Sequence, residues 1–218
     1  MERFRTLLIV CIAALSTVGC SSQPEPATQD QLNVVEAAPV EEILPPDTDD
    51  RVFLDSATAR AGAEQNILPA GAKSVLKTDG KLTYGQWVWN DEEVGEGPLE
   101  VRVDTRNQLL SVYRGGHEIG TSVILYGAEG HETPLGTFPI KRKVADYHSR
   151  SYDAPMPYSL FLTDDGVAIH GSDVRYGRAT HGCVGLPEEF AQRLFDAAET
   201  GDRVEVYRGP TAGQPSQS

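Results

Sequence analysis

Short runs in which apolar and polar residues alternate dominate the chain beyond Pro98. Neighbouring residues of a strand face opposite sides, so a period of two predicts strands with one buried face. The predicted strands are LEVRV (99–103), QLLSVYR (108–114), EIGTSVILY (118–126), GTFPIKR (136–142), YSLFLT (158–163), VAIH (167–170) and VEVY (204–207). Asn107 and the pair Gly115-Gly116 fall where hairpin turns are needed.

One segment near the C-terminus has helical spacing instead. In PEEFAQRLFDAAETGD, Pro187 suits a first turn, Gly201 suits a stop, and Phe190, Leu194 and Ala198 fall on one face. Strands therefore outnumber helices. The pattern predicts a mainly β domain over residues 98–208 with one short C-terminal helix, long enough to bury one core.

The segments outside this domain differ in composition. Residues 51–97 contain a possible short helix, DSATARAGAEQ, and a possible strand, YGQWVWN, so we expect an extension packed on the domain. Residues 20–50 are rich in Pro, Gln, Glu and Asp, which predicts a disordered acidic linker, and residues 209–218 are expected to form a disordered tail. The net charge of −13 is the opposite of the excess of basic residues that is typical of nucleic-acid-binding domains.

The N-terminus has the layout of a secretory signal. Arg3 and Arg5 precede the uncharged run LLIVCIAALSTVG, which is shorter than the roughly 20 apolar residues of a bilayer span. We expect residues 1–19 to be removed. The junction Thr17-Val18-Gly19-Cys20 resembles a bacterial lipobox, which implies lipid modification of Cys20 and anchoring in the periplasm, at the outer membrane, because no Asp follows the Cys.

The chain has three cysteines. Because Cys11 is expected to leave with the signal and Cys20 to carry lipid, Cys183 is the one thiol left in the mature chain. Exported proteins usually pair their cysteines, so an unpaired one calls for a functional explanation. A buried, inert Cys is the plain alternative. However, His181 lies two residues before Cys183 and His170 ends a predicted strand, and an imidazole that accepts the thiol proton makes a nucleophile. Gly182 leaves room for an acyl group and for backbone N–H donors to an oxyanion.

Several motifs in order resemble one known family. THGCV with an upstream IHG is similar to the active-site signature of the L,D-transpeptidase catalytic domain (YkuD-like) family, whose β-rich domain, a sandwich or barrel, crosslinks peptidoglycan. Over residues 98–208, LEVRVDTRNQLLSVYRGG resembles the family's opening hairpin, TPLGTF its TPxGxF stretch, MPY the segment before the His-bearing strand, and GDRVEVY the last strand.

The resemblance implies a role for each matching residue. Cys183 is the expected nucleophile and His170 the proton acceptor and donor, while His181, Gly182 and Thr180 shape the loop that orients the thiol, and Thr180 is also expected to contact substrate. The implied reaction is a thioester formed with the third residue of a tetrapeptide stem, releasing D-Ala, and resolved by an amine. No cofactor or metal is implied.

Two departures from the family pattern concern the substrate. Gly185 stands where the family usually has Arg or Asn, and the segment from His170 to His181 is shorter than in many relatives. Arg175 and Arg178 are candidates to supply the missing polar contact, because guanidinium groups bind the carboxylates of stem peptides well. The acceptor could be a stem, a D-amino acid or a protein Lys.

Three other functions are compatible with these residues. His170, His181 and Cys183 could bind zinc, as in some cell-wall amidases. Water could replace the amine, which would make the protein a Cys-dependent carboxypeptidase or endopeptidase. A non-catalytic wall-binding lipoprotein would not need the thiol. His117-Glu118 and His131-Glu132 begin like a zinc-protease motif but lack its second His, so we interpret them as surface or loop residues.

Overall fold

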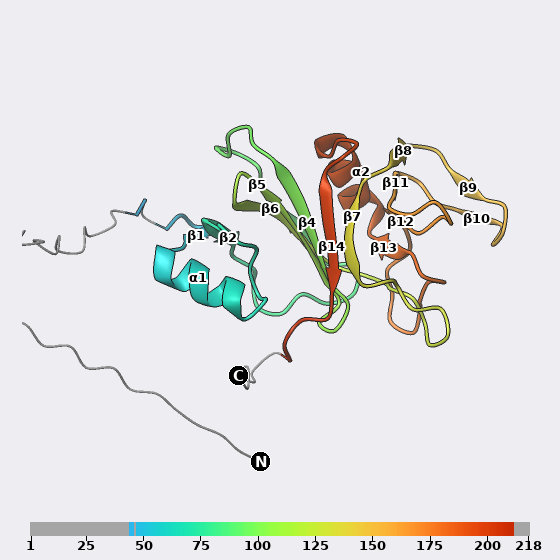
Figure 1. Cartoon of the computed structure of the whole chain (residues 1–218), viewed down its shortest axis with the longest axis horizontal. Helices are drawn as coiled ribbons and strands as arrows, with labels where there is room; N and C mark the ends of the chain where they lie inside the picture. Colours follow the sequence, from blue (N-terminus) through green and yellow to red (C-terminus); the bar gives the residue numbers. More distant parts are fainter. Residues whose placement is uncertain (1–43, 46, 212–218) are drawn as a thin grey trace, which may run out of the picture. The chain divides into compact units, whose positions relative to one another are not determined.

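The computed structural model describes residues 44–45 and 47–211, which all belong to one structural unit (Figure 1). The predicted signal, Cys20, most of the acidic linker and most of the tail lie outside the described residues. Among the residues that are described, no helix is long and apolar enough to cross a membrane.

The larger of the two main sheets has eight strands in the order β1-β2-β6-β5-β4-β14-β7, with β3 also paired to β6. Its strands are β1 (Arg51–Phe53), β2 (Ser74–Leu76), β3 (Trp87–Trp89), β4 (Leu99–Asp104), β5 (Leu109–Arg114), β6 (His117–Val123), β7 (Gly136–Pro139) and β14 (Arg203–Tyr207). Strands β4, β5 and β6 form two antiparallel hairpins, as the alternating pattern predicts. Gly115 and Gly116 have φ of 57° and 90°, which a tight hairpin turn requires and L-residues resist.

The smaller sheet has the order β13-β12-β11-β8. It consists of β8 (Arg142–Val144), β11 (Ser159–Phe161), β12 (Ala168–Gly171) and β13 (Val184–Leu186), and only the β12–β13 pair is parallel. A separate two-stranded hairpin, β9 (His148–Ser149) and β10 (Ala154–Pro155), lies in the chain between β8 and β11. The sequence pattern predicts β11 and β12 but not β8, β9, β10 or β13.

One cluster of buried side chains joins both sheets to the helix α2 (Glu188–Ala197). The large sheet contributes Val101, Val112 and Ile119, and the small sheet contributes Leu160, Ile169, Val184 and Leu186, all almost fully buried. Phe190 and Leu194 fill the centre from α2, as the helical spacing predicts. Each such side chain stabilises the fold by about 1.5–3 kcal/mol. This core supports β12 and β13 from one side and leaves their other face for chemistry.

The extension before Gly97 shares the large sheet rather than merely packing on it. Strands β2 and β3 both pair with β6, and β1 pairs with β2. The helix α1 (Ser56–Glu64) begins where Asp55 Oδ1 accepts a hydrogen bond from the backbone N of Thr58 at 2.7 Å. The predicted short helix thus forms, and the predicted strand YGQWVWN forms over its residues Trp87–Trp89.

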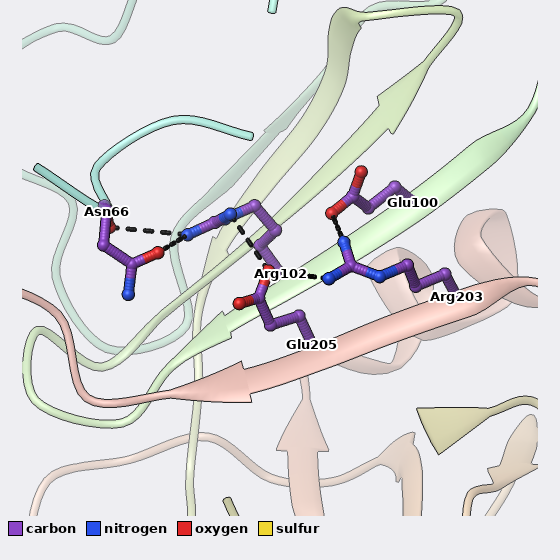
Figure 2. A network of polar contacts seen from close by, with 5 residues as sticks. All are labelled: Asn66, Glu100, Arg102, Arg203 and Glu205. Atoms are coloured by element: carbon purple, nitrogen blue, oxygen red, sulfur yellow. Dashed lines mark hydrogen bonds and ion pairs between the residues drawn. The ribbon is translucent and has the colours of Figure 1, made fainter. Parts of the chain in front are cut away.

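A polar network holds Asn66, two residues beyond α1, against the sheet (Figure 2). Arg102, almost fully buried, forms an ion pair with Glu205 at 3.0 Å and donates to Asn66 Oδ1 at 2.7 Å. Its guanidinium also lies 4.3 Å from the ring centroid of Tyr207. Arg203 pairs with Glu100 and Glu205 alongside it. The network connects the extension to β4 and β14.

Candidate active site

His170 lies on β12, and Cys183, which immediately precedes β13, lies on the same face of this strand pair. In the parallel β12–β13 pair, Ile169 is opposite Val184 and His170 is opposite Gly185, so Cys183 lies beside Ala168. Ile169 and Val184 point into the main core, and their neighbours in sequence therefore point to the opposite face. The two residues lie on neighbouring segments of the sheet. Cys183 is two positions before the residue opposite His170, which is roughly 7 Å along the strand direction.

The orientation of His170 is fixed by its neighbour. Its Nδ1 lies 2.8 Å from the carbonyl oxygen of Gly171, which can only accept a hydrogen bond, so Nδ1 carries the proton. The Nε2 atom then has a free lone pair. Burial lowers the pKa of His170 below its ordinary value, although the bond to Gly171 opposes that change. The ring is therefore neutral near pH 7 and able to accept a proton.

Cys183 is half-buried against Met156, Phe161 and Ala168. Its Sγ lies 3.8 Å from the carbonyl oxygen of Gly166, to which the thiol donates. Burial raises the pKa of the Cys183 thiol, the backbone N–H of Ala168 lowers it, and the carboxylate of Asp165 raises it. Thiol and imidazole are thus both neutral at rest.

The loop before Cys183 is held by its own side chains and by the segment 125–128. Gly182 has φ of 105°, a conformation that L-residues rarely adopt. The Thr180 hydroxyl donates to the carbonyl of Cys183. The backbone N of Thr180 donates to Tyr126 at 3.0 Å, and its carbonyl accepts from Ala128 at 3.1 Å. Thr180 therefore helps to hold the loop through contacts within the chain, and its contact with substrate stays a prediction.

His181 is exposed and lies between two other rings. Its ring centroid is 4.6 Å from that of Tyr152, in a stacked arrangement, and 5.0 Å from that of His131, edge to face. Sequence reasoning interprets His131 as a loop residue, which it is, but does not predict this contact. The same interpretation of His117-Glu118 is wrong, because both residues belong to β6 and Glu118 is buried. Tyr152 is absent from every predicted motif. Only the fold brings His131 and Tyr152 to the loop that precedes Cys183.

This geometry agrees with the comparison to known proteins. The sequence model of the YkuD family, the L,D-transpeptidase catalytic domain, matches residues 98–206. The chain belongs to this family.

Individual L,D-transpeptidases are similar to parts of the chain. L,D-transpeptidase 1 of Mycobacterium tuberculosis is 27% identical over 114 residues, and the match covers 44% of this chain and 45% of the relative. The solved L,D-transpeptidase of Stackebrandtia nassauensis has 25% identity and a TM-score of 0.49, covering 55% of this chain and 61% of that one. The solved Enterococcus faecium L,D-transpeptidase has 26% identity and a TM-score of 0.47, covering 51% of this chain and 50% of that one. The chain thus spans about half the length of the curated relative.

The structure gives a physical reason for one departure from the L,D-transpeptidase pattern. A Cβ atom at Gly185 would lie 3.0 Å from Ser172 Cβ and 3.3 Å from Leu125 Cβ. Gly185 also exchanges two backbone hydrogen bonds of 2.9 Å with Leu125. Ser172 and Leu125 therefore occupy the space in which the family's usual Arg or Asn side chain would begin.

The two arginines predicted to compensate for Gly185 have a partner within their own loop. Arg175 and Arg178 are largely exposed, and both pair with Asp173, Arg178 at 3.8 Å. Tyr176 from the same loop contacts Tyr84 edge to face, at 5.9 Å between ring centroids. The structure thus places both guanidinium groups beside a carboxylate of the chain, and their contact with substrate stays a prediction.

The zinc alternative has no support in the described part of the chain. There, no three side chains of His, Cys, Asp or Glu form a group that could hold a metal ion. The reason lies in the surroundings of the two histidines: His170 is buried on β12, whereas the exposed ring of His181 contacts Tyr152 and His131. Sequence spacing alone allows His170, His181 and Cys183 to converge, but the fold does not bring them together as ligands.

Proposed function

We propose that this chain is a peptidoglycan L,D-transpeptidase in which Cys183 forms a thioester with a tetrapeptide stem and transfers it to an amine. The observation that supports this most directly is the shared face of β12 and β13. It carries a thiol and an imidazole whose Nδ1 is held by Gly171, so that Nε2 is left to act on the thiol.

The proposed reaction has two steps. Sγ of Cys183 attacks the carbonyl between the third and fourth stem residues while His170 Nε2 takes the thiol proton. The imidazolium returns this proton to the leaving amine of D-Ala, and the thioester remains. An amine then attacks the thioester, His170 accepts a proton from the attacking nitrogen, and the proton passes to the departing sulfur. The thiol and the neutral imidazole are restored.

Gly182 and Cys183 are our candidates for oxyanion stabilisation. The left-handed backbone of Gly182 turns the chain immediately before the nucleophile, and no side chain at that position obstructs an acyl group. Backbone N–H donors near the reacting carbonyl would stabilise the negative oxygen of the tetrahedral intermediate, an effect that typically contributes several kcal/mol.

The test is incubation of the full chain with tetrapeptide muropeptides, compared with Cys183→Ala. We expect crosslinked dimers, or exchange of the terminal D-amino acid, from the unaltered chain alone. Tripeptide monomers as the only product would instead identify a hydrolase. Equal product from both proteins would contradict the proposal, and binding without turnover in both would favour a wall-binding lipoprotein. A mass adduct of a carbapenem on Cys183 would independently support acylation.

We also propose that Cys20 carries lipid and anchors the domain in the periplasm, at the outer membrane. The lipobox-like junction before Cys20 supports this, and the acidic segment of residues 20–50 would give the domain reach from its anchor. Growth of the producing cells with radioactive palmitate should label the full chain but not Cys20→Ser. Absence of label in both would contradict the anchor while leaving the enzymatic proposal intact.

A further inference from the structure

We propose that Thr133 is a positioning residue for Cys183: its hydroxyl holds the backbone carbonyl of the nucleophile and so sets the direction of the thiol. Thr133 belongs to the TPLGTF stretch, fifty positions before Cys183, and neither the family signature nor the site geometry above assigns it a role. The inference rests on the proposed function in that it takes Cys183 to be the nucleophile.

The hydrogen bonds of Thr133 have a defined direction. Its side chain is buried, with 5% exposure, and Oγ1 accepts a hydrogen bond from the backbone N–H of Gly127 at 2.9 Å. A hydroxyl has a single proton, and that proton is free to be donated to the carbonyl oxygen of Cys183 at 3.5 Å. The Thr180 hydroxyl donates to the same oxygen. Two threonines from different segments thus converge on one carbonyl.

This carbonyl matters because its direction and that of the thiol are linked. Rotation of the peptide group after Cys183 changes ψ, and the side chain must then move relative to β12. Gly182, on the other side, has φ of 105° and lacks a side chain that could restrict the turn. The hydroxyls of Thr133 and Thr180 therefore supply the restraint that Gly182 lacks, and they keep Sγ on the face that carries His170.

Thr133 is itself held by a tightly built segment. A Cβ atom at Gly127 would lie 1.9 Å from the carbonyl oxygen of His131, so only glycine permits the close turn that brings Thr133 back to Gly127. Leu125, two residues before Gly127, exchanges two hydrogen bonds with Gly185. The segment 125–133 thus contacts the chain on both sides of Cys183, and Thr133 joins it to the nucleophile itself.

The experiment compares Thr133→Val with Thr133→Ser in the full chain. Valine has nearly the same shape but no hydroxyl, whereas serine restores it. The first measurement is the rate at which iodoacetamide alkylates Cys183 across a pH series, read by mass spectrometry of the peptide that contains Cys183. The second is the kcat and KM of stem-peptide transfer.

We expect Thr133→Val to lower both the alkylation rate and kcat about 3- to 10-fold, the effect of one hydrogen bond, with KM unchanged. Thr133→Ser should restore both rates to within about twofold. Wild-type alkylation and kcat in a folded Thr133→Val protein, or no rescue by serine, would overturn the inference. If the valine variant does not fold, Thr133→Ala carries the same expectation.

A matched control separates positioning from general loss of stability. Thr105 has a similar exposure, 6%, and its hydroxyl donates to the carbonyl of Tyr207 at 3.1 Å, in the turn after β4. Thr105→Val should lower the urea midpoint by a comparable amount while alkylation stays at the wild-type rate. Equal slowing in both variants would contradict the assignment. Alkylation does not need peptidoglycan. If the unaltered chain showed no transfer activity, the proposed function would be contradicted, but the alkylation rates would still test the role of Thr133.

Discussion

Tyr152 stacks on His181, with ring centroids 4.6 Å apart and ring planes 21° from parallel. Tyr152 lies in the turn of the β9–β10 hairpin, and His181 belongs to the loop that carries Cys183. In the same hairpin, His148 Nε2 on β9 lies 2.9 Å from Asp153 Oδ1 in the turn. Both partners of the stack are exposed. The hairpin is therefore connected to the loop before Cys183 by a contact of modest strength, about 0.5–1.5 kcal/mol for an aromatic pair.

Removal of this ring should affect the reaction more than the fold. We expect Tyr152→Ala to lower kcat/KM for stem-peptide transfer about 2- to 10-fold, because the hairpin loses its contact with His181. Tyr152→Phe, which keeps the stack, should remain near the unaltered rate. Tyr176→Ala is the control, since Tyr176 is even more exposed and contacts Tyr84 instead. Equal losses in both alanine variants would contradict a specific role for Tyr152.

The pH dependence should reflect a neutral resting pair. Burial lowers the pKa of His170 and raises that of Cys183. Because His170 must be unprotonated to accept a proton, kcat/KM should fall only when the pH drops below about 6.5, the ordinary histidine value. Because the pKa of Cys183 is raised, the rate of its alkylation by iodoacetamide should reach its plateau at a higher pH than the rate for free cysteine. A plateau of fast alkylation between pH 5 and 7 would instead indicate a preformed thiolate–imidazolium pair.

The same burial predicts a change in stability. A histidine whose pKa is lowered by folding binds its proton more readily in the unfolded chain, so its contribution is complete above about pH 6.5 and is lost as the pH falls below that value. The free energy of unfolding of the unaltered chain should therefore decrease more steeply from pH 7 to 5 than that of His170→Gln. Urea titrations at both pH values measure this difference. Parallel slopes would contradict it.

Local sequence determines much of this fold. The alternating runs and the glycine pair at 115–116 predict β4, β5 and β6 because each has one face in the core, and the spacing of Phe190 and Leu194 predicts α2. Strand β13 has only three residues and contains Gly185, so no alternation distinguishes it. Its conformation depends on its parallel pairing with β12, a long-range contact that no local pattern encodes.

The residues of the candidate site are likewise predicted in part by local sequence, and the rest depend on tertiary contacts. The thiol, both histidines and Gly182 stand out in one short stretch, and the resemblance to the family assigns them roles. Tyr152 could not be found in this way, because it lies in a turn without a motif. Thr133 begins the TPLGTF stretch, but its contact with Cys183 joins residues fifty positions apart and has no local signal. Arg175 and Arg178 lie near the site in sequence, yet their pairing with Asp173 depends on the loop conformation.

The Arg102 network should contribute to stability and not to the reaction. Arg102→Ala leaves Glu205 and Asn66 without their buried partner, and we expect a loss of about 3 kcal/mol in the free energy of unfolding. Arg203→Ala breaks more exposed ion pairs and should cost less than about 1 kcal/mol. Urea denaturation measures both losses. If both variants lost equal stability, or if Arg102→Ala changed kcat of the folded enzyme, this interpretation of the network would be wrong.

Gly185 provides a test of why this chain departs from the family pattern. Gly185 is not among the residues with positive φ, so a larger residue meets no backbone strain and its cost must come from packing. A Cβ 3.0 Å from Ser172 Cβ is too close, and we expect Gly185→Ala to lower the free energy of unfolding by about 1–3 kcal/mol.

Removal of the opposing side chain should recover part of this loss. Ser172→Gly combined with Gly185→Ala should be more stable than the sum of the single changes by at least about 0.5 kcal/mol, because the two residues share one space. Gly95→Ala serves as the reference, since a Cβ there meets no atom within 4 Å and Gly95 likewise lacks a positive φ. Strictly additive effects of Ser172→Gly and Gly185→Ala in urea titrations would show that Ser172 does not exclude the larger residue. Crowding by Leu125 would then be the remaining cause, because its Cβ is the other near neighbour.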